Sequence, residues 1–339
     1  MRIPEGAIRY NTDSNKMEVW IGDTWMEVSV TFEALGISGR GIFAGGYQNP
    51  GFNTIDFIQI STLGNAIEFG DTTFSAMQTA GFGNRIRGIY AGSYIPASMN
   101  NTIEFVNFAT TGNGQDFGDA VITKGKRAGC NSPTRGIIAG GGSDAGYPAH
   151  TKDDEIDFVT MSSTGNAQDF GNLTVARDRI QGFSSPTRGV FCGGESGPSG
   201  SPSTEDTVDY ITIASVGNAT DFGNLTDARN MTSTASNNTR GLCMGGANHP
   251  AMAKNVIDFV TIATTGNFTD FGDLFQGGRV GGAVSSPTRI VQGEGIDASA
   301  NSNLLQFVTI ATTGNATDFG DLTLARNGQA SMSNTNGGL

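Results

Sequence analysis

The sequence is poor in the residues on which enzymes, disulfide-rich domains and membrane proteins depend. Its 339 residues include only two histidines, three cysteines and two tryptophans, and charged residues make up 15%. No apolar run approaches the roughly 18 residues that span a bilayer, and residues 1–10 lack the basic start and apolar stretch of a secretion signal. The net charge of −12 disfavours nucleic acid and anionic membranes as partners. We therefore expect neither nucleic-acid binding nor membrane insertion.

The few cysteines and histidines do not form a recognisable site. Cys130, Cys192 and Cys243 are an odd number scattered through apolar runs, so we interpret them as buried small side chains rather than a disulfide framework. His150 and His249 fall in predicted loops with no ligand partner at metal-binding spacing. No nucleophile elbow, zinc helix or phosphate loop is present. We expect no cofactor, no metal and no enzymatic activity.

What the sequence has instead is a repeat. A Phe-Gly motif recurs six times, and successive copies are 48, 53, 52, 49 and 48 residues apart; its phenylalanines are Phe69, Phe117, Phe170, Phe222, Phe271 and Phe319. Internal repeats of this length indicate propeller blades or solenoid units. Many of the 50 glycines fall at fixed positions in the repeat, where turns are expected. The composition therefore indicates an ordered repeat array rather than disorder.

Each repeat carries four strand signals. An apolar run ends at a Gly-Asn pair, such as Gly217-Asn218, and the Phe-Gly motif follows, which predicts a two-residue hairpin turn at the pair. A strand that ends in small residues, such as 188–194, comes before that run, and a loop of variable length separates the two. The segment 176–185 predicts the fourth and innermost strand. Four strands per unit is typical of a propeller blade.

The repeats resemble the kelch repeat, whose innermost strand begins near an arginine and whose second strand ends in a glycine pair. The pair occurs here as Gly45-Gly46, Gly140-Gly141, Gly193-Gly194 and Gly245-Gly246, with Gly92-Ser93 and Gly293-Glu294 as departures. The resemblance covers residues 39–339. It implies an all-β fold, a six-bladed kelch-like β-propeller.

The ends of the repeat array complement each other. The first repeat has no clear innermost strand, whereas the chain ends with a surplus one near Ala325–Asn334. Pairing that strand beside Arg40–Gly46 would close a ring and remove two sheet edges. We therefore predict three regions: an N-terminal docking β-meander at 1–30, a linker at 31–38 and a six-bladed propeller at 39–339, closed by the C-terminal strand.

Charged residues recur at two positions of the repeat. An arginine opens the second strand at Arg40, Arg87, Arg135, Arg188, Arg240 and Arg289. An acid lies in the third strand at Asp56, Glu104, Asp157, Asp209 and Asp258, with Gln306 in the sixth repeat. The acids could line a channel that binds a cation or sugar. We favour a structural role in which the two series pair with each other, because a feature present in every repeat is typical of scaffold. The acids at 153–155 are similarly interpreted as a solvated loop rather than a calcium site.

Residues 5–28 differ from the repeats and contain both tryptophans. Turn residues separate three short runs of alternating polarity, which predicts a small meander that must pack on something. One interpretation is a cover for the bottom of the propeller. The other is a docking element that uses Tyr10, Trp20 and Trp25 to anchor on a partner.

The same segment resembles a motif that recurs in structural proteins of bacteriophage virions, especially tail and fibre components. Gly6, Ile8–Thr12, Asn15-Lys16, Glu18, Gly22 and Trp25 carry the match. The repeated Ala-Thr-Thr-Gly-Asn-Ala-Thr-Asp-Phe-Gly-Asp phrase also resembles repeats in virion proteins of marine tailed phages, including cyanobacterial ones. These resemblances imply a virion protein, assembled in the bacterial cytoplasm, whose N-terminal segment binds other virion proteins and which forms a homo-oligomer in the particle.

Three functions remain open. The preferred one is a tail or capsid fibre or adhesion module whose propeller contacts a host surface glycan or protein. Its variable loops would present Tyr47, Tyr94, Tyr147 and His249 to the receptor. The second is a purely architectural decoration of the particle. A carbohydrate-active enzyme comes last, because enzymes place dissimilar residues at one pocket and this chain varies mainly in loop length.

Overall fold

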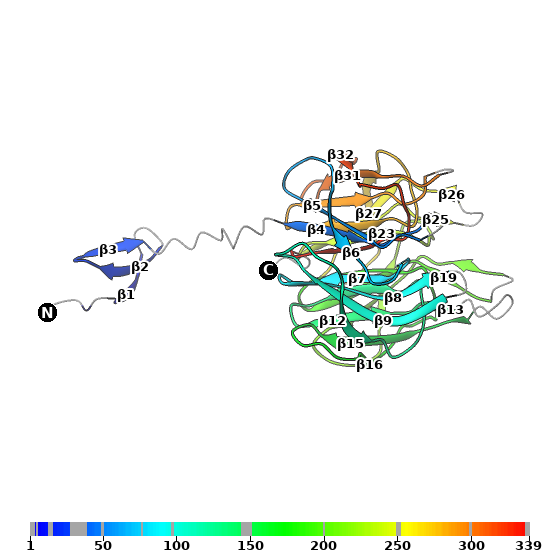
Figure 1. Ribbon diagram of the computed structural model, residues 1–339, viewed down its shortest axis with the longest axis horizontal. Coiled ribbons are helices and arrows are strands. Elements are labelled where there is room, and N and C mark those ends of the chain that lie inside the picture. Colours follow the sequence, from blue (N-terminus) through cyan, green and yellow to red (C-terminus); the bar gives the residue numbers. More distant parts are fainter. Residues whose placement is uncertain are drawn as a thin grey trace. The chain divides into compact units, whose positions relative to one another are not determined.

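The computed structural model contains β-strands and no helix in the residues that it describes (Figure 1). These are all residues except 1–3, 5, 13–15, 28–38, 49–50, 76, 96–97, 144–150, 199–200, 249–251, 298–299 and 336–339. Within them, therefore, no helix is long and apolar enough to cross a membrane. The chain divides into two compact units, Met1–Ser38 and Gly39–Leu339.

Unit 1, Met1–Ser38, is the predicted three-stranded meander. Strands β1 (Ile8–Asn11), β2 (Lys16–Ile21) and β3 (Thr24–Glu27) pair in sequence order, all antiparallel. The turn between β2 and β3 contains Gly22 and Asp23, both at positive φ, as a two-residue hairpin requires. Sequence alternation and turn chemistry were sufficient to predict this sheet.

The described residues of unit 2, Gly39–Leu339, form six four-stranded antiparallel sheets, which we number 1 to 6 by the order of their second strands. The second strands are β4 (Arg40–Ala44), β8 (Arg87–Ile95), β12 (Arg135–Ala139), β18 (Arg188–Cys192), β24 (Arg240–Met244) and β30 (Arg289–Gly293). The third strands are β5 (Thr54–Gln59), β9 (Ser98–Asn107), β15 (Glu155–Thr160), β21 (Thr207–Thr212), β27 (Val256–Thr261) and β31 (Leu304–Thr309). The fourth strands are β6 (Ile67–Asp71), β10 (Gln115–Asp119), β16 (Gln168–Asn172), β22 (Thr220–Asn224), β28 (Thr269–Asp273) and β32 (Thr317–Asp321).

The remaining strand of each sheet is its inner strand. The inner strands of sheets 1 to 6 are β33 (Ala330–Ser333), β7 (Ala80–Gly83), β11 (Ala128–Asn131), β17 (Gln181–Ser184), β23 (Ser233–Ser236) and β29 (Gly282–Ser285). Each inner strand contacts the inner strands of the two neighbouring sheets, and β33 contacts both β29 and β7, so the order is cyclic. The inner strand predicted at 176–185 is shorter than expected, because its Ala-Arg part precedes β17.

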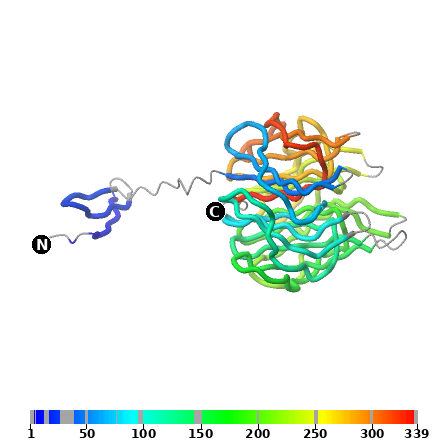
Figure 2. The backbone as a smooth tube through the Cα atoms, in the orientation of Figure 1, coloured from blue at the N-terminus to red at the C-terminus, as the bar shows by residue number. Residues whose placement is uncertain are grey.

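The C-terminal strand completes sheet 1. In β33, Ala330 pairs with Ala44 and Ser333 with Gly41, antiparallel to β4. Figure 2 shows the first and last strands of unit 2 side by side. The predicted pairing of the C-terminal strand with Arg40–Gly46 is therefore confirmed. Sheet 6 already has four strands of its own, and β33 pairs in sheet 1 instead. Backbone hydrogen bonds between β33 and β4 therefore join the two ends of unit 2.

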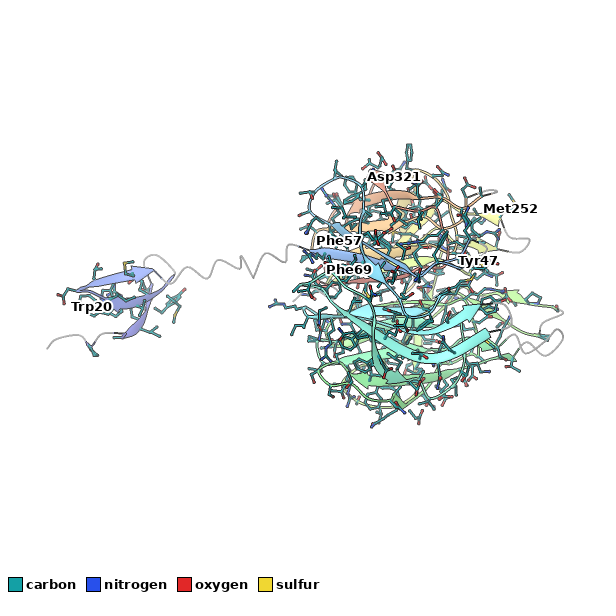
Figure 3. All side chains as sticks on the ribbon, in the orientation of Figure 1. Trp20, Tyr47, Phe57, Phe69, Met252 and Asp321 are labelled. Carbon is teal, nitrogen blue, oxygen red and sulfur yellow. The ribbon has the colours of Figure 1, made fainter. Side chains whose placement is uncertain are left out.

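The hydrophobic cores lie between neighbouring sheets rather than within one sheet. One cluster joins Phe43 and Ile58 of sheet 1 to Val291 and Leu305 of sheet 6, across the point where the chain ends meet. In five of the six third strands, the aromatic residue between two buried residues is half-buried. In sheet 1 this residue is Phe57, whose ring packs edge-on against Phe69 with 5.9 Å between the ring centroids (Figure 3). The three cysteines, Cys130, Cys192 and Cys243, are fully buried and unpaired, as expected.

The Gly-Asn pairs do not form the predicted two-residue turns. Seven residues separate the third and fourth strands in all six sheets, and the loop reaches over to the fourth strand of the preceding sheet. In the loop of sheet 4, the N–H of Gly217 donates to the carbonyl of Phe170 at 2.8 Å, and Asn218 Oδ1 accepts from the N–H of Asn172 at 3.1 Å. We call this contact the outer clasp. The equivalent asparagines are Asn65, Asn113, Asn166, Asn218, Asn267 and Asn315.

The outer clasp also explains the glycine of the Phe-Gly motif. A Cβ on Gly171 would lie 2.5 Å from the carbonyl oxygen of Gly217, and the other five motif glycines face the next loop as closely. Their φ values, between +144° and +158°, also favour glycine. The motif glycine is therefore required because the backbone of the fourth strand and the backbone of the next loop approach each other closely there.

Candidate functional site

The arginines that open the second strands join neighbouring sheets. The Arg188 guanidinium lies 4.4 Å from the Tyr210 ring of its own sheet, and its Nη1 donates to the carbonyl of Ile262 in sheet 5 at 2.8 Å. The same pair of contacts recurs in every sheet, and Arg289 of sheet 6 donates to Ile60 of sheet 1. The full series of donors is Arg40, Arg87, Arg135, Arg188, Arg240 and Arg289.

Four of the five buried acids pair with a different set of arginines, and Glu104 binds the Tyr90 and Thr73 hydroxyls, so the predicted pairing of the two series is wrong. Asp258 binds Arg229 at 2.5 Å and accepts hydrogen bonds from the N–H and Oγ1 of Thr226. Both charged side chains are 0% exposed. The physical reason is location. Arg229 lies before the inner strand, beside Asp258. Arg240 lies at the start of β24, at the other end of the sheet, where it contacts the Phe259 ring and donates to the carbonyl of Ile310.

The same arrangement, which we call the Asp-Thr-Arg clamp, is complete in three sheets. Its members are Asp56 with Thr323 and Arg326, Asp209 with Thr174 and Arg177, and Asp258 with Thr226 and Arg229. Each clamp fixes the connection that enters the sheet from its neighbour. In sheet 3 the cation comes from Arg127, which binds Asp157 at 2.8 Å, and no threonine of the described residues donates to this carboxylate. These four aspartates are thus each paired with an arginine in the interior and do not face a channel as a cation site.

The residues that precede the inner strands form a closed ring of hydrogen bonds. The N–H of Arg179 donates to the carbonyl of Lys126 at 3.0 Å, Met231 donates to Arg179 at 3.0 Å, and the series returns to its start without a break. The ring residues, which we call the inner ring, are Gln78, Lys126, Arg179, Met231, Val280 and Gly328. All six have positive φ, between +48° and +70°. Left-handed backbone is costly for Met and Val, so the ring contact determines the conformation.

A hollow runs along the inner strands from the inner ring. Its wall includes all six ring residues, small side chains such as Gly129 and Gly182, and polar side chains such as Thr79 and Gln329. Among the described residues that line it, three are cationic and none is acidic. This composition is unusual for a chain whose net charge is −12.

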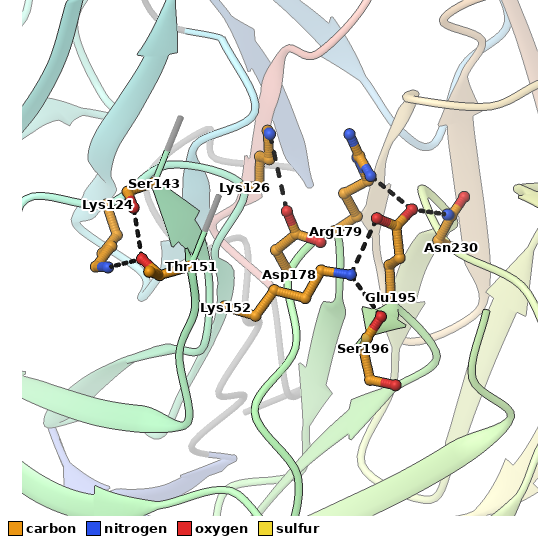
Figure 4. A network of polar contacts seen from close by, with 10 residues as sticks. All are labelled: Lys124, Lys126, Ser143, Thr151, Lys152, Asp178, Arg179, Glu195, Ser196 and Asn230. Atoms are coloured by element: carbon orange, nitrogen blue, oxygen red, sulfur yellow. Dashed lines mark hydrogen bonds and ion pairs between the residues drawn. The ribbon is translucent and has the colours of Figure 1, made fainter. Parts of the chain in front are cut away.

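A polar network surrounds one side of the inner ring (Figure 4). Glu195 accepts from Arg179 at 2.6 Å, from Lys152 at 3.1 Å and from Asn230 at 3.1 Å. Lys126 lies 3.8 Å from Asp178. Glu195 also begins a hairpin, so the network joins the ring to the hairpin side of the unit.

Where the loops between second and third strands are described, three of them are extended by two-stranded hairpins. They are β13 (Gly142–Ser143) with β14 (Thr151–Lys152), β19 (Glu195–Ser196) with β20 (Ser203–Thr204), and β25 (Ala247–Asn248) with β26 (Met252–Ala253). In Figure 1 they project from one side of unit 2, opposite the start of β4. Isolated bridges such as Asp178 to Glu195 and Asn230 to Ala247 place the inner ring beside them.

The predicted receptor residues lie on this side where they can be placed. Tyr47 is half-buried, and its N–H donates to the carbonyl of Asn327 at 2.7 Å. The half-buried Tyr94 ring lies 4.2 Å from Lys126 Nζ, at the edge of the inner ring. Tyr147 and His249 lie outside the described residues. The inner ring was not anticipated from the sequence, because five of its members are not glycine and carry no signal for positive φ.

In unit 1 the predicted docking residues fall on opposite faces of the sheet. Trp20 pairs with Trp25, their rings meet edge-on at 5.3 Å, and Arg9 lies 4.2 Å from the Trp25 ring. Arg9 also binds Glu18 at 2.7 Å. Tyr10 points to the other face, so the three aromatic residues do not form one patch. The hydrogen bonds from Asn11 and Arg9 lower the pKa of Glu18, which keeps this face charged.

The face that contains Tyr10 is apolar and uncovered within the described part of unit 1. The register aligns Ile8 with Val19 and Met26, and Tyr10 with Met17. The exposed fractions are 65% for Ile8, 55% for Tyr10, 46% for Met17 and 51% for Met26, and Ile21 at the edge is 48% exposed. We call this surface the docking face. The sequence indicates this face through the alternation of side chains along each strand. This alternation places Ile8, Met17 and Met26 on the docking face and the tryptophans on the other face.

No protein-family model and no curated protein matches the chain. The described residues hold no group of three or more His, Cys, Asp or Glu side chains that could bind a metal ion. The candidate functional surfaces are therefore the docking face of unit 1 and, on unit 2, the hairpin side with the hollow inside the inner ring.

Proposed function

We propose that the protein is a structural component of a bacteriophage virion. Unit 1 anchors it to another virion protein, and unit 2 is a six-bladed kelch-like β-propeller that is displayed as a tail or capsid fibre or adhesion module and contacts the host surface. The observation that carries the proposal is the docking face: a sheet too small to fold around its own core leaves one apolar side in water. The N-terminal resemblance to phage structural proteins supplies the identity of the partner.

The propeller part of the proposal is supported by three cyclic sets of contacts. The inner ring, the second-strand arginines and the outer clasps each connect all six sheets and return from sheet 6 to sheet 1. A propeller requires closure of this kind, because an open array would leave edge strands and an uncovered core at both ends. The six repeats differ most in the loop between the second and third strands, where the hairpins lie on one side of unit 2. Loops of this kind usually form binding surfaces.

Incorporation into particles tests the anchoring role. Virions produced without the chain are complemented with the full-length protein or with Met17→Lys or Met26→Lys, and purified particles are assayed for the protein. Each lysine places a charge on a surface that becomes buried, so occupancy is expected to fall about tenfold or more. Matched controls are Leu63→Lys and Val216→Lys, which alter side chains of unit 2 that are 61% and 59% exposed. If the docking-face variants are incorporated normally, this mode of anchoring is wrong.

An architectural decoration without receptor binding is the second candidate. It is favoured by the number of repeated side chains that are occupied in contacts between sheets, as in the Arg188 and Asp258 series. Adsorption distinguishes the two functions. Particles that carry a variant of the exposed hairpin residue Met252, 67% exposed, such as Met252→Glu, are expected to adsorb more slowly to host cells if unit 2 binds the surface. Particles that lack the protein but adsorb at the normal rate support the decoration role instead.

A further inference from the structure

Two of the three cysteines face each other across the join of sheets 4 and 5. Cys192 ends β18 and pairs with Val208 of β21. Cys243 lies in β24 and pairs with Asp258 of β27, which shares a face with Val260. Residues opposite each other in paired strands point to the same face of the sheet. These two faces pack together, because one core cluster contains Val208, Val260 and both cysteines. The two thiols, both fully buried, therefore meet at this join.

The other five joins have different side chains at the two positions. Only the join of sheets 4 and 5 brings two thiols together, since the third cysteine, Cys130, lies between sheets 3 and 4. The fifth join has Gln292 with Met244. The remaining four place a large side chain opposite alanine or glycine: Tyr90 with Ala44, Ile138 with Ala91, Phe191 with Ala139, and Phe43 with Gly293.

The surroundings give the two thiols different chemical roles. Arg229 Nη2 donates to the backbone carbonyl of Cys243 at 3.4 Å, so a buried cation lies beside this cysteine. Burial raises the pKa of Cys243, but the hydrogen bond with Cys192 and the Arg229 charge outweigh it and lower the pKa to about 7. The same hydrogen bond, together with burial, raises the pKa of Cys192. A thiolate beside a protonated thiol is typical of a cysteine pair that reacts with oxidants.

We propose that Cys192 and Cys243 are an oxidisable pair that forms a disulfide between sheets 4 and 5, with hydrogen peroxide as the oxidant. The Cys243 thiolate attacks one peroxide oxygen, the O–O bond breaks, and the departing hydroxide takes a proton from solvent and leaves as water. Cys243 is then a sulfenic acid. The Cys192 sulfur attacks its sulfur, the S–S bond forms, and the hydroxyl leaves as water with the Cys192 proton. In total the two thiols lose two electrons, and the peroxide is reduced to two molecules of water.

The bond would lock two neighbouring sheets after the protein has folded. A disulfide stabilises mainly by restricting the unfolded chain, and more so when it closes a long loop, as this one does. The oxidant has to be small, and hydrogen peroxide is little larger than water. Gln181 and Thr234, which pair with Cys192 and Cys243, line the hollow, so the hollow comes within one strand of the pair. The chemistry depends on unit 2 alone. Its timing rests on the proposed function: the thiols stay reduced in the bacterial cytoplasm, and the bond forms after the particle is released.

Peptide mapping of the full-length protein tests the pair, because trypsin separates the three cysteines. Cys192 falls in peptide 189–229, Cys243 in 241–254 and Cys130 in 128–135. The folded protein is treated with hydrogen peroxide, its remaining thiols are alkylated in urea, and it is digested without reduction. We expect 189–229 linked to 241–254, with the loss of two hydrogens, and 128–135 alkylated. Alkylation of all three cysteines, irreversible oxidation of Cys243 without a link, or equal linkage of Cys130 would overturn the proposal.

Alanine variants provide a matched comparison. Cys192→Ala introduces the residue that sheets 1, 2 and 3 already have at this position. It removes the second thiol, so Cys243 is expected to stop at the sulfenic acid, which dimedone traps. Cys130→Ala should form the link as the parent does. Loss of the link in Cys130→Ala, or no dimedone adduct in Cys192→Ala, contradicts the assignment.

Urea denaturation measures the effect of the link on stability. Peroxide should raise the urea midpoint of the parent, dithiothreitol should reverse the rise, and Cys192→Ala should show none. Equal midpoints for the linked and the reduced parent contradict a stabilising link. All these measurements use the purified protein without particles, so a failure here is distinguishable from a failure of the proposed function.

Discussion

In sheets 1, 4 and 5 a buried carboxylate meets a buried guanidinium, whereas sheets 2 and 6 fill the same place without an arginine. The position of Arg177 corresponds to Gly278 in sheet 6, and to Ala76, outside the described residues, in sheet 2. In sheet 2 Glu104 replaces the aspartate and accepts hydrogen bonds from the hydroxyls of Tyr90 and Thr73. Burial and the neighbouring Glu104 raise the pKa of Tyr90, so its hydroxyl remains a donor.

Sheet 6 replaces the charged pair with a neutral network. Gln306 accepts from the backbone N–H of Phe275 at 2.7 Å and donates to Gln292 Oε1 at 3.0 Å. The space of the missing arginine is taken by Glu294: a Cβ on Gly278 would lie 2.6 Å from its Cγ. Glu294 is 0% exposed. In sheets 2 and 6, where no arginine pairs with the third-strand position, that residue and the one opposite it on the second strand are Glu104 with Tyr90 and Gln306 with Gln292.

The comparison shows that the buried polar groups at this position need hydrogen-bond or ion-pair partners, and that the residues need not form a charged pair. A buried charge is expensive unless it is paired, so an arginine and an aspartate can be exchanged only together. The sheets with clamps are therefore expected to be sensitive to removal of one partner, and sheets 2 and 6 to changes in their hydrogen bonds.

The largest effect is expected when one half of a clamp is removed. Arg229→Met leaves the Asp258 carboxylate buried without its cation, which costs about 3–5 kcal/mol of unfolding free energy. Urea denaturation of purified unit 2 variants or of the whole chain measures the loss. Arg229→Met with Asp258→Asn is expected to recover most of it, because the amide still accepts from Thr226 and carries no charge. A single variant as stable as the parent would contradict the clamp.

The sequence contained part of this information. The Leu-Thr-x-Ala-Arg phrase precedes the inner strands of sheets 4, 5 and 1 and ends at Arg177, Arg229 and Arg326, the three sheets whose clamps are complete. Strand alternation predicts that Asp258 faces inward, but it does not select which arginine reaches it. That choice depends on the path of the connection between sheets.

Other features could be predicted to different extents. The repeat, the four strands and the pairing of the C-terminal strand follow from period and from the surplus strand. The outer clasp could not be predicted from the sequence, since a Gly-Asn pair is equally typical of a hairpin turn. Only the position of the neighbouring sheet shows that the loop binds there. The inner ring has even less signal, because tertiary contacts impose positive φ on Met231 and Val280.

Sheet 6 should respond to pH in a way that the clamp sheets do not. Burial raises the pKa of Glu294 from 4.5 to about 7, with Ser302 opposing and Asp297 adding to the rise. The folded state therefore holds its proton more tightly than the unfolded state, and the contribution of Glu294 to stability falls as pH rises from about 4.5 to about 7. Glu294→Gln is expected to stabilise the protein by about 3 kcal/mol at pH 8. At pH 4 the variant and parent should unfold together; a constant difference at both pH values would contradict the shift.

Sheet 2 offers a smaller test that needs no change of charge. Tyr90→Phe removes the hydroxyl that donates to Glu104, while Thr73 continues to donate. A buried carboxylate that loses one of its donors costs about 2 kcal/mol, measured by denaturation at neutral pH. The matched control is Tyr210→Phe, because the equivalent residue of the other five sheets is phenylalanine; its effect should remain within about 0.5 kcal/mol. Equal effects of the two changes would show that Glu104 does not depend on Tyr90.

The smallest effect is expected at the outer clasp, which all six sheets share. Asn218→Ala removes the acceptor for the N–H of Asn172, an exposed bond of 3.1 Å, and should cost about 1 kcal/mol. Asn218→Asp keeps an acceptor oxygen and is expected to retain most of the stability, which separates the hydrogen bond from loss of side-chain volume. If alanine and aspartate cost the same, the asparagine acts through something other than this bond. Because the clasps are far apart, combining Asn218→Ala with Asn65→Ala at the join of sheets 6 and 1 should cost the sum of the two; a larger loss would mark the join as the place where the ring opens first.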